Sequence, residues 1–452
     1  MKFNKICILG LGYIGLPTAG MFAANGLQVL GVDVNPSVVE TLQAGGIHIH
    51  EPGLRELAQA ALQSGTLTVA AAPSEADAFI IAVPTPFQEG KFGEYNGDPS
   101  TQLRQSHRPD VPSGGQAYKL ADMTAVISAA EAIVPHLRKG NLVVLESTSP
   151  PRTTVDLVAP ILEMTGLRAG VDFHLVYSPE RVLPGQILHE LVENARVIGG
   201  VTPQSAQAGA DLYASFVKGE IIQTDATTAE MVKLMENTTR DINIAIAIEF
   251  SRLAERFGVD VWEAIRLANR HPRVKILSPG PGVGGHCISV DPWFFVEAAP
   301  DLSQLILRAR QVNDQQPAFV VEMVEKAIGA LNGKKIAALG LAYKPDVDDL
   351  RESPAVEVVH LLTKAGAAVK AFEPFKPGAV LPGVEMVATL ELALQDADAV
   401  LLLVNHSEFQ QLNPETLKTI TPARILLDTV NGWAGKDWAA AGFELFRLGV
   451  GK

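Results

Sequence analysis

Cys287 is one of only two cysteines among the 452 residues, and it closes the glycine-rich run Pro279-Gly-Pro-Gly-Val-Gly-Gly-His-Cys287. Glycines allow a backbone to approach a ligand closely, and a carboxylate, Asp291, follows four residues later. A cysteine becomes a nucleophile when its thiolate is stabilised. Cysteines outside disulfides are most often small buried hydrophobes, which is the competing interpretation of Cys287 and the one that suits Cys7, inside an apolar run.

A second set of polar residues has helical spacing. Lys233 and Asn237 are four residues apart and Arg240 follows three later, so a helix places all three on one face. An amine and an amide there can hold a developing oxyanion, although a solvated helix face has the same pattern. Glu180 follows a predicted strand and can act as a base for water, although a solvated loop carboxylate is an equally simple explanation.

Three glycines near the amino terminus predict a dinucleotide site. Gly10, Gly12 and Gly15 lie between a predicted strand and a predicted helix, where they permit a tight turn, close approach to a pyrophosphate and close helix packing. The helix amino terminus presents N–H groups to the phosphates. Asp33, at the end of the next predicted strand, can accept from a ribose 2′-hydroxyl and repel a 2′-phosphate, so the pattern favours NAD over NADP.

Two more predicted strands end in loops that carry threonine. Thr85 lies in Val83-Pro-Thr-Pro86, and Thr148 lies in Glu146-Ser-Thr-Ser-Pro150. Ligands of open α/β sheets bind at the carboxyl ends of strands, so both threonines are candidate cofactor contacts. Turn chemistry also favours threonine, serine and proline at strand ends, and these two motifs do not decide between the explanations.

Strand and helix patterns alternate along most of the chain, which predicts parallel, doubly wound sheets. The expected strands are 5–10, 28–33, 78–83, 141–146 and 173–177, then 333–340, 368–372, 399–404 and 425–428. Thr227-Thr-Ala-Glu230 has capping-box spacing before a helical pattern that runs to about Phe257. A second helix is expected over 261–268, and a long surface loop over 88–117.

The predicted fold class is therefore α/β, with two doubly wound Rossmann-like domains joined by a central helical domain that contains a long helix. The expected domains are 1–205, which binds NAD, 206–315, which carries the lysine and the cysteine, and 316–452. The last of these has Gly340-Leu-Ala342 in place of a complete glycine fingerprint, a pattern compatible with a mononucleotide.

Composition narrows the class of partner. A net charge of −13 argues against nucleic acid and membrane surfaces, and an anionic ligand would need local bases such as His271 and Arg273. Two cysteines make no disulfide framework, so we expect a reducing, cytoplasmic compartment. No apolar run reaches the roughly 18 residues of a membrane span, and no metal site is expected.

Together these motifs resemble the UDP-glucose/GDP-mannose dehydrogenase family, in order from residue 5 to about residue 430. The motifs that carry the resemblance are Gly10-Leu-Gly-Tyr-Ile-Gly-Leu-Pro17, Glu146-Ser-Thr-Ser-Pro150, Ser178-Pro-Glu-Arg-Val-Leu-Pro-Gly185, Lys233 with Asn237, Gly282-Val-Gly-Gly-His-Cys287, and Gly340-Leu-Ala-Tyr-Lys-Pro-Asp346 with Arg351-Glu-Ser-Pro354. The resemblance implies a homodimeric enzyme that oxidises the C6 alcohol of a UDP-sugar to a carboxylate with two NAD⁺.

The resemblance also implies roles for individual residues. Cys287 would be the nucleophile, Lys233 the essential lysine with Asn237 beside it, Asp291 the acid near the thiol, and Glu180 the hydrolytic carboxylate. The implied NAD contacts are Gly10, Gly12, Tyr13, Ile14, Gly15, Asp33, Thr85, Thr148 and Arg351. The implied nucleotide-sugar contacts are Arg181, Val182, Arg240, His271, Arg273, Gly284, Tyr343 and Lys344.

Two departures from the family pattern bear on these expectations. Arg152 stands where the family usually has glycine, and a positive φ there would add strain. Pro184 replaces a second glutamate of the UDP-glucose branch, which argues against that substrate. The alternatives are UDP-N-acetylglucosamine or UDP-glucose as substrate, a two-electron hydroxyacid dehydrogenase, and a catalytically silent nucleotide-sugar sensor.

Overall fold

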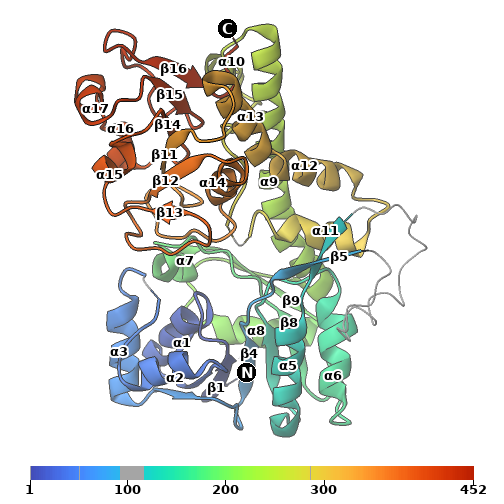
Figure 1. The fold of residues 1–452 in the computed structure, drawn as a ribbon. Coiled ribbons are helices and arrows are strands. Elements are labelled where there is room, and N and C mark those ends of the chain that lie inside the picture. Colours follow the sequence, from blue (N-terminus) through green and yellow to red (C-terminus); the bar gives the residue numbers. More distant parts are fainter. Residues whose placement is uncertain (1, 50, 92–116, 286, 452) are drawn as a thin grey trace. The chain divides into compact units, whose positions relative to one another are not determined.

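The computed structural model describes residues 2–49, 51–91, 117–285 and 287–451. Packing divides the chain into two compact units, Met1–Glu236 with Trp293–Ser303, and Asn237–Pro292 with Gln304–Lys452. The border between them falls inside the long helix α9, Ala226–Phe257 (Figure 1). The three domain ranges expected from the sequence remain a prediction.

The amino-terminal unit contains a sheet of eight strands among the described residues, in the order β10-β9-β8-β7-β4-β1-β2-β3. Its strands are β1 Lys5–Leu9, β2 Gln28–Val32, β3 Leu67–Ala70, β4 Ala78–Ile81, β7 Leu142–Leu145, β8 His174–Tyr177, β9 Arg196–Gly200 and β10 Ile221–Asp225. Every pair is parallel except β8 and β9. The central strands are buried throughout because helices cover both faces, which accounts for their apolar runs.

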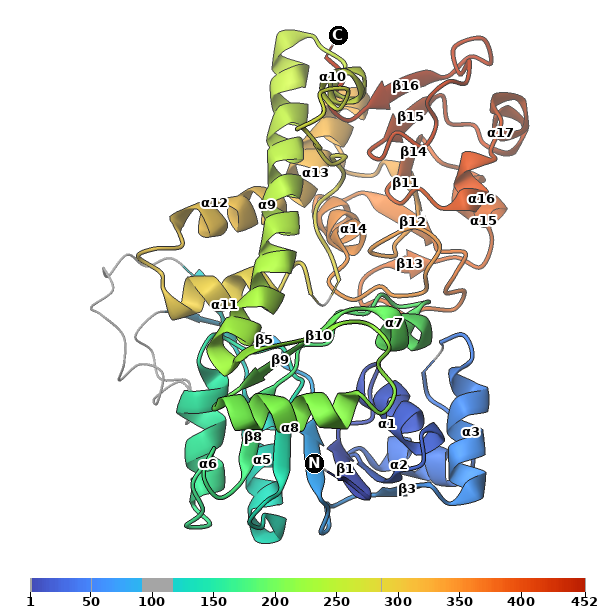
Figure 2. The same ribbon diagram turned by 180° about the vertical axis from the view of Figure 1, so that it is seen from behind.

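Helices lie on both faces of this sheet, with α5 and α6 in front of it in Figure 1 and α8 in front in the reverse view of Figure 2. The helices of the unit are α1 Gly15–Ala24, α2 Pro36–Gln43, α3 Leu54–Ser64, α5 Thr124–Ile133, α6 Ala159–Glu163, α7 Ile187–Glu193 and α8 Pro203–Tyr213, with a 3₁₀ turn at Val134–His136 and a π-helical turn at Thr154–Val158. Helix α11, Asp291–Ala298, begins in the other unit and continues into this one.

The expected loop over 88–117 is corrected at its ends. Strands β5, Phe87–Lys91, and β6, Ala117–Ala121, pair as an antiparallel ribbon. Both are short and contain polar residues, so their apolar pattern is weak in the sequence. Residues 92–116 of the expected loop lie outside the described residues.

The carboxy-terminal unit contains a sheet of six parallel strands among the described residues, in the order β13-β12-β11-β14-β15-β16. Its strands are β11 Lys335–Leu339, β12 Ala368–Phe372, β13 Glu385–Met386, β14 Ala399–Leu402, β15 Ile425–Asp428 and β16 Glu444–Arg447. Its helices are α10 Val261–Ala268, α12 Gln304–Asp314, α13 Gln316–Ile328, α14 Pro354–Lys364, α15 Leu390–Leu394, α16 Ser407–Gln410 and α17 Pro414–Ile420. Separate apolar clusters cover the two faces of the sheet.

Helix α9 ends at Phe257, as expected, before Gly258 in the left-handed region at φ 69°. The expected capping box is wrong. The helix begins at Ala226, so the side chain of Asp225 accepts from the N–H and hydroxyl of Thr228, and Glu230 points elsewhere. The predicted fold class is confirmed, with a parallel-sheet Rossmann-like domain at each end and a helical central region. Among the described residues, no helix combines the length and hydropathy that crossing a bilayer requires.

Candidate functional site

The amino-terminal glycine turn has the geometry of a dinucleotide site. Gly10 has φ 93°, and a Cβ on it would lie 2.5 Å from the carbonyl oxygen of Ala82. A Cβ on Gly15 would collide with the backbone of Gly10, whereas a Cβ on Gly12 would meet nothing within 4 Å. The first and third glycines therefore allow tight packing, and the second leaves the open approach that a pyrophosphate needs.

Asp33 lies beside this turn, directly after β2. Its Oδ2 accepts from the backbone N–H of Leu11 at 2.9 Å, and its Oδ1 accepts from the N–H of Asn35 at 2.9 Å. Asp33 is half-buried, and Tyr13, within the glycine turn, is exposed. A fixed carboxylate at this position fits a ribose with a 2′-hydroxyl and disfavours a 2′-phosphate, so these residues fit NAD.

The loops that carry Thr85 and Thr148 lie together. They follow the paired strands β4 and β7, and the hydroxyl of Ser147 donates to the carbonyl of Val83 at 2.8 Å. Both threonines are half-buried. The structure thus places them at the carboxyl edge of the sheet that also carries the glycine turn.

The next segment of the second loop is held by Glu230, which the sequence singled out only as part of a capping box. Its Oε1 accepts from the N–H and hydroxyl of Thr154, and its Oε2 accepts from the N–H of Arg152 at 2.5 Å. Burial raises the pKa of Glu230 to about 7, because desolvation of the charged form outweighs these hydrogen bonds. Arg152 has φ 74°, so the positive φ considered for this departure is present. Glu230 lies one helical turn before the buried Lys233 on α9 and ties that helix to the loop after β7.

Glu180 follows β8, and its side chain is only 8% exposed. Its Oε1 accepts from the N–H of Arg181 at 2.7 Å, and its Oε2 is paired with the guanidinium of Arg196. The side chain of Arg181 is paired with Glu236 at 2.8 Å, and Val182 packs against the apolar core. Arg196 was not predicted, and its only signal is a charge at the start of an apolar run.

Cys287, Asp291 and Asn237 come together in the carboxy-terminal unit. The backbone N–H of Asp291 donates to the carbonyl of Cys287 at 2.8 Å, and the side-chain amide of Asn237 donates to Asp291 Oδ2 at 2.5 Å. Cys287 is exposed, whereas Asp291 is buried. Cys7 is buried, and desolvation raises the pKa of its thiol to about 11, as suits a structural cysteine. The amide of Asn237 therefore orients the carboxylate next to the cysteine turn.

The glycine-rich run before Cys287 packs against the segment after β11. A Cβ on Gly284 would lie 2.5 Å from the carbonyl oxygen of Glu352, and a Cβ on Gly285 would lie 3.0 Å from the ring of Tyr343. Lys344, next to Tyr343, is half-buried. These contacts bring together two of the motifs that the sequence assigned to the nucleotide-sugar.

The remaining predicted residues are placed as follows. Arg240 is exposed on α9, and His271 and Arg273 are exposed after α10. Arg351 is exposed and makes a bidentate pair with Asp349. The amino-terminal unit holds Gly10, Gly12, Tyr13, Ile14, Gly15, Asp33, Thr85, Thr148, Glu180, Arg181, Val182 and Lys233. The carboxy-terminal unit holds Asn237, Arg240, His271, Arg273, Gly284, Cys287, Asp291, Tyr343, Lys344 and Arg351.

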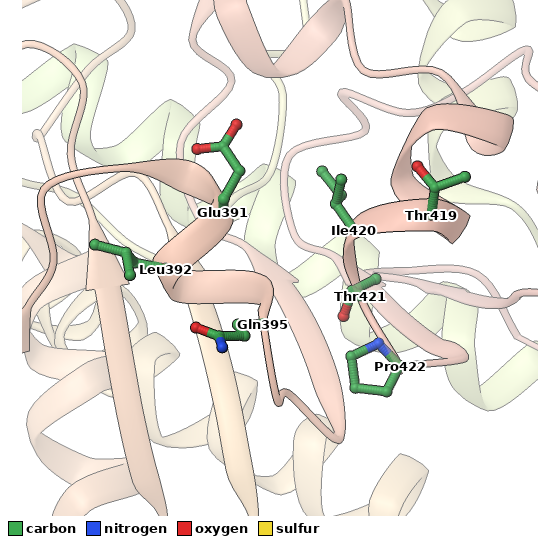
Figure 3. Close-up of a pocket in the computed structure, with 7 residues that line it drawn as sticks. All are labelled: Glu391, Leu392, Gln395, Thr419, Ile420, Thr421 and Pro422. Atoms are coloured by element: carbon green, nitrogen blue, oxygen red, sulfur yellow. The ribbon is translucent and has the colours of Figure 1, made fainter.

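The carboxy-terminal unit also has a groove that none of these residues line. Figure 3 shows it between α15 and α17, lined by Glu391, Leu392, Gln395, Thr419, Ile420, Thr421 and Pro422. Gln395 lies shortly before β14 and Pro422 shortly before β15, so the groove adjoins the edge of the sheet at which these strands begin. Ligands of such sheets bind at the opposite, carboxyl ends, and no function is assigned to the groove.

Models of one family match three successive parts of the chain. Residues 4–217 match the NAD binding domain of the UDP-glucose/GDP-mannose dehydrogenase family, residues 227–315 its central domain, and residues 337–434 its UDP binding domain. These matches, with the glycine turn and Asp33, confirm NAD as the cofactor.

Individual relatives agree over nearly the whole length. A UDP-N-acetyl-D-mannosamine dehydrogenase from Methanocaldococcus jannaschii is 44% identical, covering 99% of this chain and 97% of the relative. An NDP-N-acetyl-D-galactosaminuronic acid dehydrogenase from Ralstonia solanacearum is 45% identical, covering 97% of this chain and 99% of the relative. The solved structure of a UDP-D-ManNAc dehydrogenase from Pyrococcus horikoshii has a TM-score of 0.85 at 40% identity, covering 99% of both chains. The chain is an NAD-dependent nucleotide-sugar dehydrogenase and belongs to the UDP-glucose/GDP-mannose dehydrogenase family.

Proposed function

We propose that this chain oxidises the C6 alcohol of UDP-N-acetyl-D-mannosamine to UDP-N-acetyl-D-mannosaminuronate, a precursor for surface polysaccharide, with two NAD⁺ and one water. The observation that carries this proposal is the turn of Cys287 and Asp291, with Asn237 hydrogen-bonded to the carboxylate. A two-electron alcohol dehydrogenase needs no such cysteine. The names of the relatives from Methanocaldococcus jannaschii and Pyrococcus horikoshii support this sugar.

The proposed chemistry keeps the aldehyde on the protein between the two oxidations. NAD, when bound, accepts one hydride in each oxidation. Cys287 adds to the aldehyde carbon as a thiolate and forms a thiohemiacetal, whose oxidation leaves a thioester. Water then cleaves the C–S bond, releasing the carboxylate and restoring the thiolate. Over the cycle, one alcohol, one water and two NAD⁺ give one carboxylate, two NADH and three protons.

The roles proposed for the other side chains follow those that the family resemblance implies. Lys233 is buried on α9, where an ammonium can stabilise the oxyanion of either tetrahedral species and exchange a proton with the alcohol. Asn237, one turn later on the same helix, orients Asp291 beside the cysteine turn. Glu180 is the proposed base for the hydrolytic water, with Asp291 as the other candidate for that step.

The stoichiometry of NADH tests the proposal. The intact chain should release two NADH per sugar oxidised, and Cys287→Ser should abolish uronate formation. Cys7→Ser is the matched control, because Cys7 is buried and takes no part in the chemistry. Undiminished uronate from Cys287→Ser would refute the nucleophile. If the intact chain releases one NADH per sugar, the two-electron dehydrogenase is favoured. If it binds UDP-sugar tightly but releases no NADH, the nucleotide-sugar sensor is favoured.

The identity of the sugar requires a separate comparison. Pro184 argues against UDP-glucose, since that branch carries a glutamate there, but a relative named for N-acetyl-D-galactosaminuronic acid is as similar as those named for N-acetyl-D-mannosamine. The kcat/KM for UDP-N-acetyl-D-mannosamine should exceed that for UDP-N-acetylglucosamine, UDP-N-acetylgalactosamine and UDP-glucose. A higher value for any of these three would replace the proposed substrate.

We also propose that two copies pair through the second half of α9, in the reducing compartment expected from the sequence. Ile246, Phe250, Leu253 and Phe257 recur at helical spacing and are 40%, 40%, 48% and 71% exposed. A contiguous apolar face of this kind marks a protein interface. Light scattering should give the intact protein twice the mass of one chain. The double variant Phe250→Glu, Leu253→Glu should have the mass of a single chain. A monomeric intact chain would contradict the pairing.

A further inference from the structure

Arg196 lies at the centre of a buried polar cluster at the carboxyl edge of the amino-terminal sheet. Arg196 is only 4% exposed. One side of the guanidinium, Nη1, donates to Ser178 Oγ at 3.0 Å and lies 3.3 Å from Glu146 Oε1, and the other, Nη2, is paired with Glu180. The guanidinium carbon lies 4.1 Å from the centre of the Tyr213 ring. One cation thus bridges two carboxylates that leave the ends of neighbouring strands.

The reversed direction of β9 accounts for this placement. Val176 pairs with Gly200 and Tyr177 with Gly199 in the antiparallel register of β8 and β9. Continuing that register past the end of β8 sets Glu180 opposite Arg196. A parallel strand would begin at the other edge of the sheet, away from the ligand-binding ends. The antiparallel pairing therefore brings the guanidinium to the level of the proposed hydrolytic carboxylate.

The charges in the cluster are not balanced when both carboxylates are ionised, because the two share one guanidinium. Burial raises the pKa of Glu146 to about 7, with Arg196 opposing the shift and Glu180 adding to it. The hydroxyl of Tyr213 donates to Glu146 Oε1. The charged and titratable groups that face Glu146 are therefore Arg196 from β9, Glu180 from the loop after β8, and Tyr213 from α8.

We propose that Arg196 is a positioning residue that holds Glu180 for attack of water on the thioester. The charge of Glu146 then determines how strongly the guanidinium of Arg196 pairs with Glu180. When Glu146 is neutral, Glu180 is the carboxylate that pairs with the guanidinium of Arg196. When Glu146 is ionised, the two carboxylates compete for the one guanidinium of Arg196. This inference rests on the proposed function, since it requires a thioester on Cys287 and a hydrolytic role for Glu180.

Arg196→Lys tests the positioning role, because lysine keeps the charge but cannot bridge both carboxylates as a planar fork does. We expect it to slow thioester hydrolysis by about 10²-fold, the usual effect of losing a positioned base, while the first hydride transfer stays rapid. Rapid quench followed by mass spectrometry of the intact protein should then show acylated Cys287 accumulating. If both hydride transfers slow equally and no acyl-enzyme accumulates, Arg196 is merely structural and the proposal fails.

Glu146→Gln tests the second part and does not depend on folding of the arginine variant. The amide keeps the shape of the neutral acid but does not titrate. If ionisation of Glu146 changes the rate of thioester hydrolysis near pH 7 in the intact chain, that change should be absent from Glu146→Gln. A pH profile identical to that of the intact chain would overturn the role of Glu146. Ile8→Val, a core substitution on β1 outside the cluster, is the control for lost stability and should not accumulate acyl-enzyme.

Glu180→Gln separates failure of this inference from failure of the proposed function. If Glu180→Gln accumulates acyl-enzyme and Arg196→Lys does not, Glu180 hydrolyses the thioester without help from Arg196. If Glu180→Gln turns over normally, the hydrolytic role of Glu180 is wrong and the inference falls with it.

Discussion

Replacing Arg152 by glycine should give a more stable protein than replacing it by alanine, the reverse of the usual order. Arg152 has φ 74°, in the left-handed region. A residue with a Cβ pays about 1–2 kcal/mol there, whereas glycine instead loses about 0.5–1 kcal/mol to the greater entropy of its unfolded chain. The difference favours glycine by about 0.5–1 kcal/mol.

Other contacts of Arg152 cancel in this comparison. The Arg152–Asp156 pair, with side chains 62% and 40% exposed, is lost in both variants and is worth only about 0.3–0.5 kcal/mol. The hydrogen bond from the backbone N–H at position 152 to Glu230 is retained in both. For a unit of this size the expected difference in melting temperature is about 1–4 °C.

Calorimetry of the full chain, without NAD and at one protein concentration, measures this difference. Ala60→Gly is the control, since Ala60 is exposed within α3 and glycine there should cost about 0.8–1 kcal/mol. If Arg152→Gly melts at or below Arg152→Ala while Ala60→Gly is destabilised as expected, the positive φ at Arg152 carries no cost and the reasoning is refuted.

Three further predictions address the cofactor, the nucleotide-sugar segment and pH. Asp33→Asn should lower kcat/KM for NAD⁺ by about 10- to 150-fold, which corresponds to the roughly 1.5–3 kcal/mol of a charged hydrogen bond. It should also reduce the ratio of kcat/KM for NAD⁺ to that for NADP⁺, and an unchanged ratio in steady-state kinetics would contradict the role of Asp33. Gly285→Ala should raise KM for the UDP-sugar, because its φ is 87° and a Cβ would lie 3.0 Å from the Tyr343 ring; an unchanged KM would contradict that role. Glu230 has a folded-state pKa raised from 4.5 to about 7, so its contribution to stability is present below pH 4.5 and is lost as pH rises through 7. Melting temperatures of Glu230→Gln should therefore fall less than those of the intact chain between pH 5 and 7, and parallel curves would count against the raised pKa.

The parts of the fold that the sequence predicted are those with strong local patterns. Helix α10, at Val261–Ala268, was predicted to the residue, and in the structure the side chain of Asp260 caps it. The buried parallel strands were predicted because their runs are apolar on both faces. Strands β9 and β10 were missed, since Arg196-Val-Ile-Gly-Gly200 contains a charge and two glycines and β10 is largely exposed. The direction of β9 depends on its pairing with β8, in which Val176 lies opposite Gly200.

The same distinction applies to the candidate site. Lys233 and Asn237 share a helix, so their spacing predicted their common face, but the partner of Asn237 is Asp291, 54 residues away. The cluster around Arg196 draws on segments after β7 and β8, on β9 and on α8, so no spacing in the sequence connects its members. The sequence singled out Glu180 by itself, but nothing in the sequence connected Arg196 with it.

The second glycine turn differs from the first in the contacts of the carboxylate that follows its second strand. Glu373 follows β12 as Asp33 follows β2, but Glu373 is 1% exposed and its Oε2 accepts from the N–H groups of Leu341 and Ala342, at 2.7 and 2.9 Å. His406 Nε2 lies 3.1 Å from the same oxygen. Since His406 Nδ1 accepts from the backbone N–H of Asp346, Nε2 carries the proton and donates to Glu373.

Glu373 accepts from two successive N–H groups of its glycine turn, whereas Asp33 accepts from one N–H group of the amino-terminal turn, that of Leu11. One more methylene than aspartate lets the Glu373 carboxylate reach further under its turn. We therefore expect the nucleotide of the carboxy-terminal sheet to be recognised by the segment that follows Gly340, which carries Tyr343 and Lys344, rather than by the turn itself. His406→Ala, which frees the Asp346 end of that segment, should weaken binding of UDP in calorimetric titration and leave the Kd for NAD⁺ unchanged. An equal loss for both ligands would contradict this division between the sheets.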